Sequence, residues 1–421
     1  MQKKSISFLI SFFLGINLVF SQEIIYNQVY KENIETVLLY KEGFEIYYPI
    51  IFLDEDAKLI LSFDEIDEKQ ESKDYQYTII HCNSDWTPSD LMFSEYIDGF
   101  EENDIDDFST SFSTFCKYLN YQVKFPNDYI KFTKSGNYII KVYENYDVED
   151  VVLTKRFYIA ENLLKIDATV KKATKPSLMD YYQEVDFSID YSGYKIKNPL
   201  SDLKIIIMQN NRTDNMISEL VPKYINNNVL EYNYDLENTF PAVNEFRYFD
   251  VKNLKFSTEK IGNIEYKDNY YHIYLRDEKI RSTEPYLFNK DINGIRFINS
   301  NIGVDQSTDA DYCFVHFIFK RDFPFTDGNL YIFSDFTDWK CDEKYKLEYN
   351  NELQQYETVL FLKQGYYNYY YALKSGEKTS TAVTEGNFYQ TENDYIIYVY
   401  QNDSNLQYDR LIAVKICSSE K

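Results

Sequence analysis

Aromatic side chains dominate this chain, which holds 43 tyrosines and 31 phenylalanines but only 12 glycines. They occur in short segments of alternating pattern, such as the one in which Leu59, Leu61 and Phe63 would share one face of a strand. Aromatic and β-branched residues favour strands, because they pack well on a half-buried pleated surface. No segment shows a sustained 3.6-residue apolar period, the pattern of an amphipathic helix. The sequence therefore predicts an all-β fold.

Polar turns and loops divide the strand-like sequence into three regions. Several short strands with polar turns between them are typical of β-sandwiches. We therefore expect tandem antiparallel β-sandwich domains of the immunoglobulin-like or early-set type. The expected division is a signal peptide at residues 1–21, an N-terminal β-sandwich at 22–162, a middle β-rich domain at 163–307 and a C-terminal immunoglobulin-like sandwich at 308–421.

The first 21 residues have the composition of a secretory signal peptide. Lys3 and Lys4 precede an apolar stretch at residues 6–20, and Ser21 is a small residue suited to cleavage before Gln22. The apolar stretch is too short to span a bilayer comfortably. No later segment is apolar enough to cross a membrane, so we expect an exported protein with no direct membrane insertion.

The charge of the chain restricts its partners. It has 68 Asp and Glu residues against 44 Lys and Arg residues, which gives a formal net charge of −24. Binding to nucleic acid or to an anionic membrane surface requires a positive face. We therefore predict no nucleic-acid partner, whereas a basic or neutral protein partner is compatible with the charge.

The chain has five cysteines, an odd number without the spacing of a recognised disulfide framework. An exported chain can oxidise its thiols, so Cys82–Cys116 and Cys313–Cys341 are candidate pairs. Buried free thiols are the alternative, and the sequence leaves both open.

The densest group of chemically versatile side chains lies at residues 75–100, which include His81, Cys82 and Trp86. Nucleophilic catalysis needs a serine or cysteine within reach of a histidine. Adjacent residues of a strand point to opposite faces, so His81 and Cys82 should not pair. The sequence also lacks the common zinc, phosphate-loop and serine-hydrolase motifs. We predict a packed structural corner here, with no catalytic residue, no cofactor and no metal site in the chain.

The C-terminal region holds a second motif around Trp339. Residues 329–340 and 347–373 resemble the early-set sandwiches that include glycogen-binding modules, with a strand, a short F-x-x-W turn, an edge hairpin and a glycine followed by alternating tyrosines. Those modules bind sugars by stacking them on aromatic side chains. The resemblance implies that Trp339 contacts glycan, although a turn tryptophan can equally pack in the structure.

A more specific resemblance extends over nearly the whole chain. Residues 75–100 resemble the plug protein of the type IX secretion system, and shorter matching motifs follow in every later region. The positions singled out as structural or partner contacts are Tyr77, His81, Cys82, Asn83, Asp85, Trp86, Ser89, Gly99, Gly136, Asn137, Arg156, Arg212, Glu245, Arg247 and Asp250.

The resemblance implies a periplasmic, non-enzymatic protein that associates with the outer-membrane barrel of the type IX translocon. Its implied role is to close the periplasmic mouth of that barrel by steric plugging when no cargo is engaged, and no cofactor is implied. Two alternative functions of other kinds stay open. One is a secreted glycan-binding β-sandwich protein, and the other is a structural surface adhesin.

Overall fold

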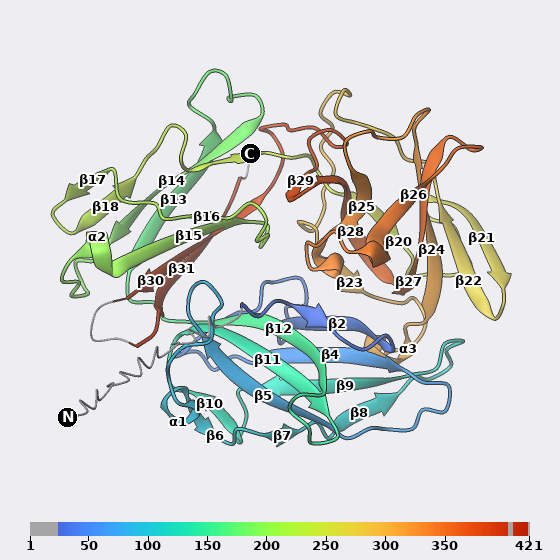
Figure 1. Cartoon of the computed structure of the whole chain (residues 1–421), viewed down its shortest axis with the longest axis horizontal. Coiled ribbons are helices and arrows are strands. Elements are labelled where there is room, and N and C mark those ends of the chain that lie inside the picture. Colours follow the sequence, from blue (N-terminus) through green and yellow to red (C-terminus); the bar gives the residue numbers. More distant parts are fainter. Residues whose placement is uncertain (1–23, 403–406, 420–421) are drawn as a thin grey trace, which may run out of the picture.

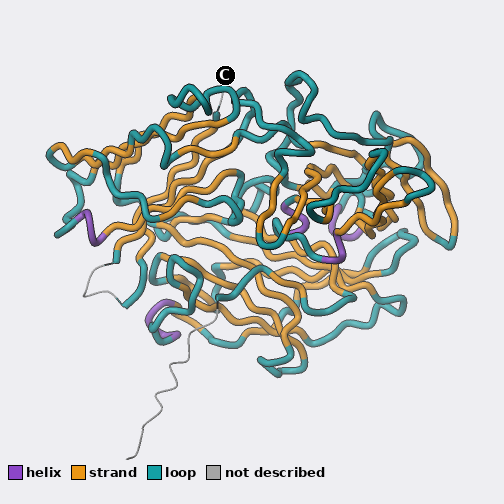
Figure 2. The backbone as a smooth tube through the Cα atoms, turned by 45° about the horizontal axis from the view of Figure 1, so that its top comes forward, coloured by secondary structure: helices purple, strands orange, loops and turns teal. Residues whose placement is uncertain are grey.

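The computed structural model describes residues 24–402 and 407–419, so the expected signal peptide at residues 1–21 lies outside the described residues. Three β-rich lobes make up the molecule (Figure 1), and its backbone consists of strands and loops with very little helix (Figure 2). No helix in the described ranges is long and apolar enough to cross a membrane. The α-helices there are single turns, namely α1 (Phe93–Tyr96), α2 (Pro199–Asp202) and α3 (Gln306–Asp309). The all-β prediction is confirmed.

The first sandwich lies at the bottom of Figure 1. Its two main sheets enclose a core that contains Leu59, Leu61 and Phe63 on one face of a strand, as the alternation predicts. One sheet has the order β1 (Gln28–Val29), β12 (Val151–Ala160), β11 (Gly136–Glu144), β5 (Tyr75–Cys82) and β7 (Asn103–Asp104), with β3 (Ile50–Phe52) beside β12. The other has the order β2 (Ile34–Lys41), β4 (Leu59–Ile66), β9 (Tyr118–Phe125) and β8 (Asp107–Thr110), and β10 (Ile130–Phe132) pairs with β6 (Ile97–Gly99).

The second sandwich combines two distant parts of the chain. In Figure 1 the dark red β30 and β31 run among green strands at the upper left. Phe187, Ile205 and Ile397 meet in its core. One sheet has the order β13 (Lys165–Lys172), β14 (Tyr182–Asp190), β18 (Val229–Tyr232) and β17 (Tyr224–Asn226), with β19 (Thr239–Pro241) beside β14. The other has the order β16 (Ile217–Ser218), β15 (Leu203–Gln209), β30 (Asp394–Gln401) and β31 (Arg410–Ser418).

The third sandwich is a ten-stranded sheet that folds over one core. Phe249 and Tyr369 on one side of this core meet Phe317 on the other, with ring centroids 5.5 Å and 5.3 Å apart. The strand order is β20 (Arg247–Asp250), β28 (Gly365–Ser375), β25 (Asn329–Phe333), β26 (Lys346–Asn350), β27 (Gln355–Lys363), β24 (Tyr312–Lys320), β22 (Tyr270–Leu275) and β21 (Ile261–Lys267). Beside β28 lie β23 (Arg296–Ile298) and β29 (Lys378–Ser380), and the 3-10 turns are η1 (Asp335–Thr337) and η2 (Glu343–Tyr345).

Strand pairing divides the chain differently from the expected ranges 163–307 and 308–421. Strands β20 to β23, which precede residue 307, belong to the third sandwich, and β30 and β31 return to the second. The pairing of β15 with β30 runs from Leu203 opposite Gln401 to Gln209 opposite Tyr395. The expected boundary at residue 307 is therefore corrected. Alternation in sequence identifies a strand, but the partner of a buried strand is a non-local choice.

All five cysteines are free thiols. Neither candidate pair, Cys82–Cys116 or Cys313–Cys341, forms a disulfide. Cys82, Cys116 and Cys313 are buried, so the structure agrees with the alternative of buried free thiols.

Candidate functional site

His81 lies on β5 with its imidazole enclosed by the first sandwich and the segment before β31. Its Nε2–H donates to the carbonyl oxygen of Ser135 at 3.2 Å, so Nδ1 accepts from the hydroxyl of Ser89 at 2.8 Å. The rings of Tyr138 and Tyr408 meet the imidazole at right angles, with centroids 4.8 Å and 5.1 Å away. Burial lowers the pKa of His81 to about 4. The side chain is a neutral histidine with both nitrogens satisfied.

At two of the positions singled out from the sequence, Gly136 and Gly99, neighbouring atoms leave no room for a Cβ. Gly136 has a φ of +150°, and a Cβ there would lie 2.4 Å from Nε2 of His81. Gly99 has a φ of +152°, and a Cβ there would lie 1.8 Å from the carbonyl oxygen of Tyr129. Both positions combine a backbone conformation that favours glycine with a lack of space.

Cys82 points away from His81, as expected for neighbours on a strand. It is buried with Trp86 and Tyr158 in an apolar cluster between the first and second sandwiches, to which the second contributes Met208 and Tyr398. Burial raises the pKa of the Cys82 thiol to about 12. The thiol is therefore protonated at neutral pH, and the prediction that His81 and Cys82 do not pair agrees with this geometry.

The polar turn after β5 holds the first sandwich against the second. Asn137 donates from Nδ2 to the carbonyl oxygen of Asn83 at 3.1 Å and accepts from the hydroxyl of Tyr400 on β30 at 2.7 Å. The backbone N–H of Ser84 donates to Asp409 at 2.9 Å. The bonds to Tyr400 and Asp409 join residues more than 260 positions apart.

Side chains within the turn fix its shape. Oδ1 of Asp85 accepts from the backbone N–H of Thr87 at 3.0 Å and from its hydroxyl at 2.6 Å. Trp86 has a φ of +69°, and its ring lies under the guanidinium of Arg156, 4.3 Å away. Arg156 also donates to the carbonyl oxygen of Ile25 at 2.8 Å. Asp85 thus supplies the local hydrogen bonds typical of turn residues.

Arg212 and Trp339 lie where the second and third sandwiches meet. The guanidinium of Arg212 lies 5.5 Å from the ring of Trp339 and 5.2 Å from that of Phe333, and pairs with Asp214 at 2.8 Å. Trp339 is half-buried and also lies against Phe246, with centroids 6.1 Å apart. The ring expected to stack on sugar is thus engaged by neighbours, and the glycan contact stays a prediction.

Arg247 on β20 is the centre of a buried ionic cluster. Its Nε donates to Glu385 at 3.0 Å, its Nη2 donates to the carbonyl oxygen of Lys279 at 2.8 Å, and its Nη1 pairs with Glu278. Arg281 reaches the same carboxylate of Glu385 at 2.5 Å. The cluster fastens the segment that follows β22 to the turn after β29.

Glu245, Asp250 and Tyr77 are the remaining positions singled out from the sequence, and each has contacts within the protein. Glu245 accepts from the hydroxyl of Tyr286, and its burial raises its pKa to about 7. Asp250 accepts from the backbone N–H of Lys252 at 3.0 Å. Tyr77 is buried in the first core.

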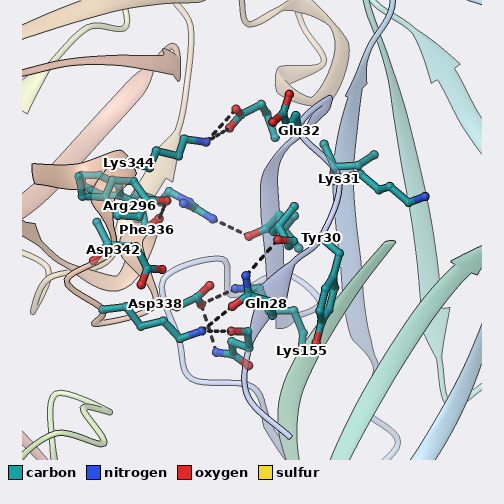
Figure 3. Close-up of a pocket in the computed structure, with 18 residues that line it drawn as sticks. Gln28, Tyr30, Lys31, Glu32, Lys155, Arg296, Phe336, Asp338, Asp342 and Lys344 are labelled. Carbon is teal, nitrogen blue, oxygen red and sulfur yellow. Dashed lines mark hydrogen bonds and ion pairs between the residues drawn. The ribbon is translucent and has the colours of Figure 1, made fainter. Parts of the chain in front are cut away.

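A cleft of about 430 Å³ separates the first and third sandwiches, and sequence reasoning missed it (Figure 3). Lys155 on β12 pairs with Asp338 at 2.5 Å across the cleft, and Lys344 pairs with Glu35 at 2.9 Å. Nη2 of Arg296 donates to the carbonyl oxygen of Val37. The paired residues are 183 to 309 positions apart, so no local pattern could reveal them.

A smaller cavity of about 220 Å³ adjoins the cleft. It is lined by both tryptophans of the chain, Trp86 and Trp339, and by Arg156. The structure thus brings three of the positions singled out from the sequence to one place, whereas His81, Arg247 and Gly99 lie in other surroundings. In residues 24–402 and 407–419, no group of three or more His, Cys, Asp or Glu side chains could hold a metal ion. In the part of the chain that the structure describes, most of the positions singled out from the sequence make contacts within one sandwich or between two of them.

Comparison with known proteins agrees with the resemblance drawn from residues 75–100. Residues 34–161, nearly all of the first sandwich, match a family described as "Type 9 secretion system plug protein 1st domain". A crystal structure of a hypothetical protein from Parabacteroides merdae is 35% identical, with a TM-score of 0.91 over 94% of this chain and 100% of that chain. No curated protein matches. The chain belongs to the family of type 9 secretion system plug proteins.

Proposed function

We propose that this protein is a non-enzymatic periplasmic accessory of the type IX translocon that closes the periplasmic mouth of the outer-membrane export barrel by steric plugging. The observation that carries the proposal is the match of residues 34–161 to the first domain of the plug family. Family membership supports a role associated with type IX secretion. The obstruction of the pore and the identity of the barrel partner are the proposed part.

The way the sandwiches are joined supports a steric role. A body that blocks a pore must keep its shape, and loosely linked domains would move relative to one another. Here an apolar cluster that includes Trp86, Met208 and Tyr398 joins the first two sandwiches. Ion pairs such as Lys155 with Asp338 join the first to the third. These contacts favour one wide, rigid body.

The strongly acidic character of the chain suggests the chemistry of the partner surface. A net charge of −24 favours a barrel rim with basic or neutral contacts. Attraction between exposed charges is screened by salt. Binding to the barrel should therefore weaken as the salt concentration rises, and binding that does not weaken would contradict this part of the proposal.

Affinity capture of the tagged protein from membranes in mild detergent tests the association. The outer-membrane barrel of the translocon should co-purify. Mature protein found only free in the medium would overturn the proposal.

Permeability tests the plugging itself. Cells that lack the protein should take up a large hydrophilic dye through the unplugged barrel, and the wild-type gene should restore exclusion. A Lys155→Ala/Lys344→Ala variant, which removes two ion pairs between sandwiches, should restore exclusion less well. Lys165→Ala, which removes only a solvent-exposed ion pair with Asp167, is the matched control. Unchanged dye exclusion without the protein would contradict plugging even if the barrel co-purifies.

A further inference from the structure

Two of the three histidines of the chain meet on the third sandwich, far from the motif residues. His272 lies on β22 and His316 on the parallel neighbour β24. Nδ1 of His272 is 3.0 Å from Nε2 of His316, and the ring centroids are 5.2 Å apart. Two imidazole nitrogens therefore face each other across adjacent strands.

Aromatic neighbours hold both rings in place. His272 stacks on Phe314, with centroids 5.0 Å apart, and His316 stacks on Tyr274 at 4.1 Å. A metal site gains affinity when its ligands are already oriented in the absence of the metal. The stacks supply this orientation without any bound ion.

The hydrogen bond between the two rings fixes which nitrogens face each other. One of these nitrogens donates and the other accepts. A cation needs the lone pairs of both, and a neutral imidazole offers its lone pair there once the donor ring carries its hydrogen on the other nitrogen.

We propose that His272 and His316 form a binding site for a late first-row divalent cation, with Zn²⁺ as the reference ligand. A tetrahedral zinc ion about 2.0 Å from two nitrogens holds them about 3.3 Å apart, close to the distance of 3.0 Å here. The cation takes the place of the hydrogen between the two rings, and that hydrogen moves to the other nitrogen of its own ring, so both imidazoles stay neutral. Because the described residues offer no cluster of three ligands, water would complete the coordination, as in an open site.

Charges of both signs lie around the pair. Glu265 on the edge strand β21 lies opposite His272, is solvent-exposed, and accepts from the hydroxyl of Tyr274 at 3.3 Å. Glu357 also acts on His316 electrostatically, whereas Lys267 opposes a positive charge there. His316 is only half-buried, so a cation can reach the pair from solvent.

Calorimetric titration of the purified protein with Zn²⁺ tests the site. We expect one ion per chain, and at least about tenfold weaker binding in His316→Gln and in His272→Gln, as expected when a ligand set is disrupted. Cu²⁺ in place of Zn²⁺ should give an electron paramagnetic resonance spectrum with two nitrogen ligands in the wild type.

Other side chains that could bind zinc provide the controls. Cys341 and Cys417 are half-buried thiols that could bind zinc elsewhere, so a Cys341→Ser/Cys417→Ser variant should keep the wild-type affinity. Far-UV circular dichroism checks that each variant folds. Equal affinity in the wild type and both histidine variants, or no binding at millimolar Zn²⁺, would overturn the proposal.

Discussion

At the scale of single residues, the motif positions are explained by packing constraints. Gly136 is a glycine because the imidazole of His81 occupies the space where a Cβ would lie. His81 in turn is fixed by Ser89 and Ser135 on either side. His81, one of the rare residues that suggest an active site in the sequence, is thus held in place by contacts with its neighbours.

The contact between Gly136 and His81 predicts the cost of adding one methyl group. Gly136→Ala should destabilise the protein by about 2–4 kcal/mol, because it combines backbone strain with overpacking. Gly193→Ala is the matched control, since a Cβ there would meet nothing within 4 Å. It should leave stability unchanged or raise it by about 0.5 kcal/mol. Urea unfolding measures both, and equal midpoints would contradict this account.

The protonation of His81 predicts a dependence of stability on pH. Its pKa is about 4 in the folded protein and about 6.5 in the unfolded chain. The unfolded state therefore binds more protons between these values, and the free energy of unfolding falls as pH drops from about 6.5 to 4.

The His81 contribution lost in acid is at most about 3 kcal/mol. His81→Gln cannot take up this proton, so its stability should fall less between pH 7.5 and pH 4.5 than that of the wild type. Comparison of the two proteins removes the contribution of other titrating groups. If the unfolding free energies of the two proteins change in parallel with pH, protonation of His81 is not linked to unfolding.

At the scale of elements, buried ion pairs fix how strands and loops meet. Glu385 is fully buried and accepts from both Arg247 on β20 and Arg281 in the segment after β22. Charged groups tolerate such burial only when they are paired. The main effect of the cluster is therefore to fix one arrangement of these elements, and its net contribution to stability is smaller.

Removal of one partner of this cluster should be costly. Arg247→Met should destabilise the protein by about 3 kcal/mol, because it leaves carboxylates buried with fewer partners. The Arg247→Met/Glu385→Gln double variant should recover part of the loss. Lys165→Met, which removes an exposed pair with Asp167, should leave stability nearly unchanged. Equal unfolding free energies for the two single variants would contradict the role of the cluster.

At the scale of the whole molecule, the C-terminal strands complete a sandwich that begins in the middle of the chain. After the third sandwich is complete, β30 and β31 return to the second, where β30 pairs with β15 and β31 with β30. The second sandwich therefore cannot form until the last strands are available. Strand β30 also carries Tyr398 and Tyr400, which contact the first sandwich.

This topology predicts which fragments fold. A fragment of residues 163–307 should stay unfolded, because it lacks β30 and β31 and exposes the core side of β15. Residues 163–246 joined by a flexible linker to residues 391–419 should fold, since this chain contains all strands of the second sandwich. Dispersion of amide signals in nuclear magnetic resonance spectra distinguishes the two. A well-dispersed spectrum of the 163–307 fragment would contradict the assignment.

The sequence by itself determined the local features of this protein. Alternating aromatic and polar residues gave the strands, because the two-residue period of a strand can be read along the chain. The motif of residues 75–100 indicated the family, and strand parity separated His81 from Cys82. Each of these inferences depends on neighbours in sequence.

Only the tertiary structure decided which strands pair and which side chains meet. The return of β30 to β15, the ion pair of Lys155 with Asp338 and the facing rings of His272 and His316 join residues 44 to more than 180 positions apart. Such contacts depend on how sheets pack and on where loops close, and a single sequence carries no periodic signal for either. The same physics explains why the domain boundary expected at residue 307 needed correction, while the strands on both sides of it were predicted.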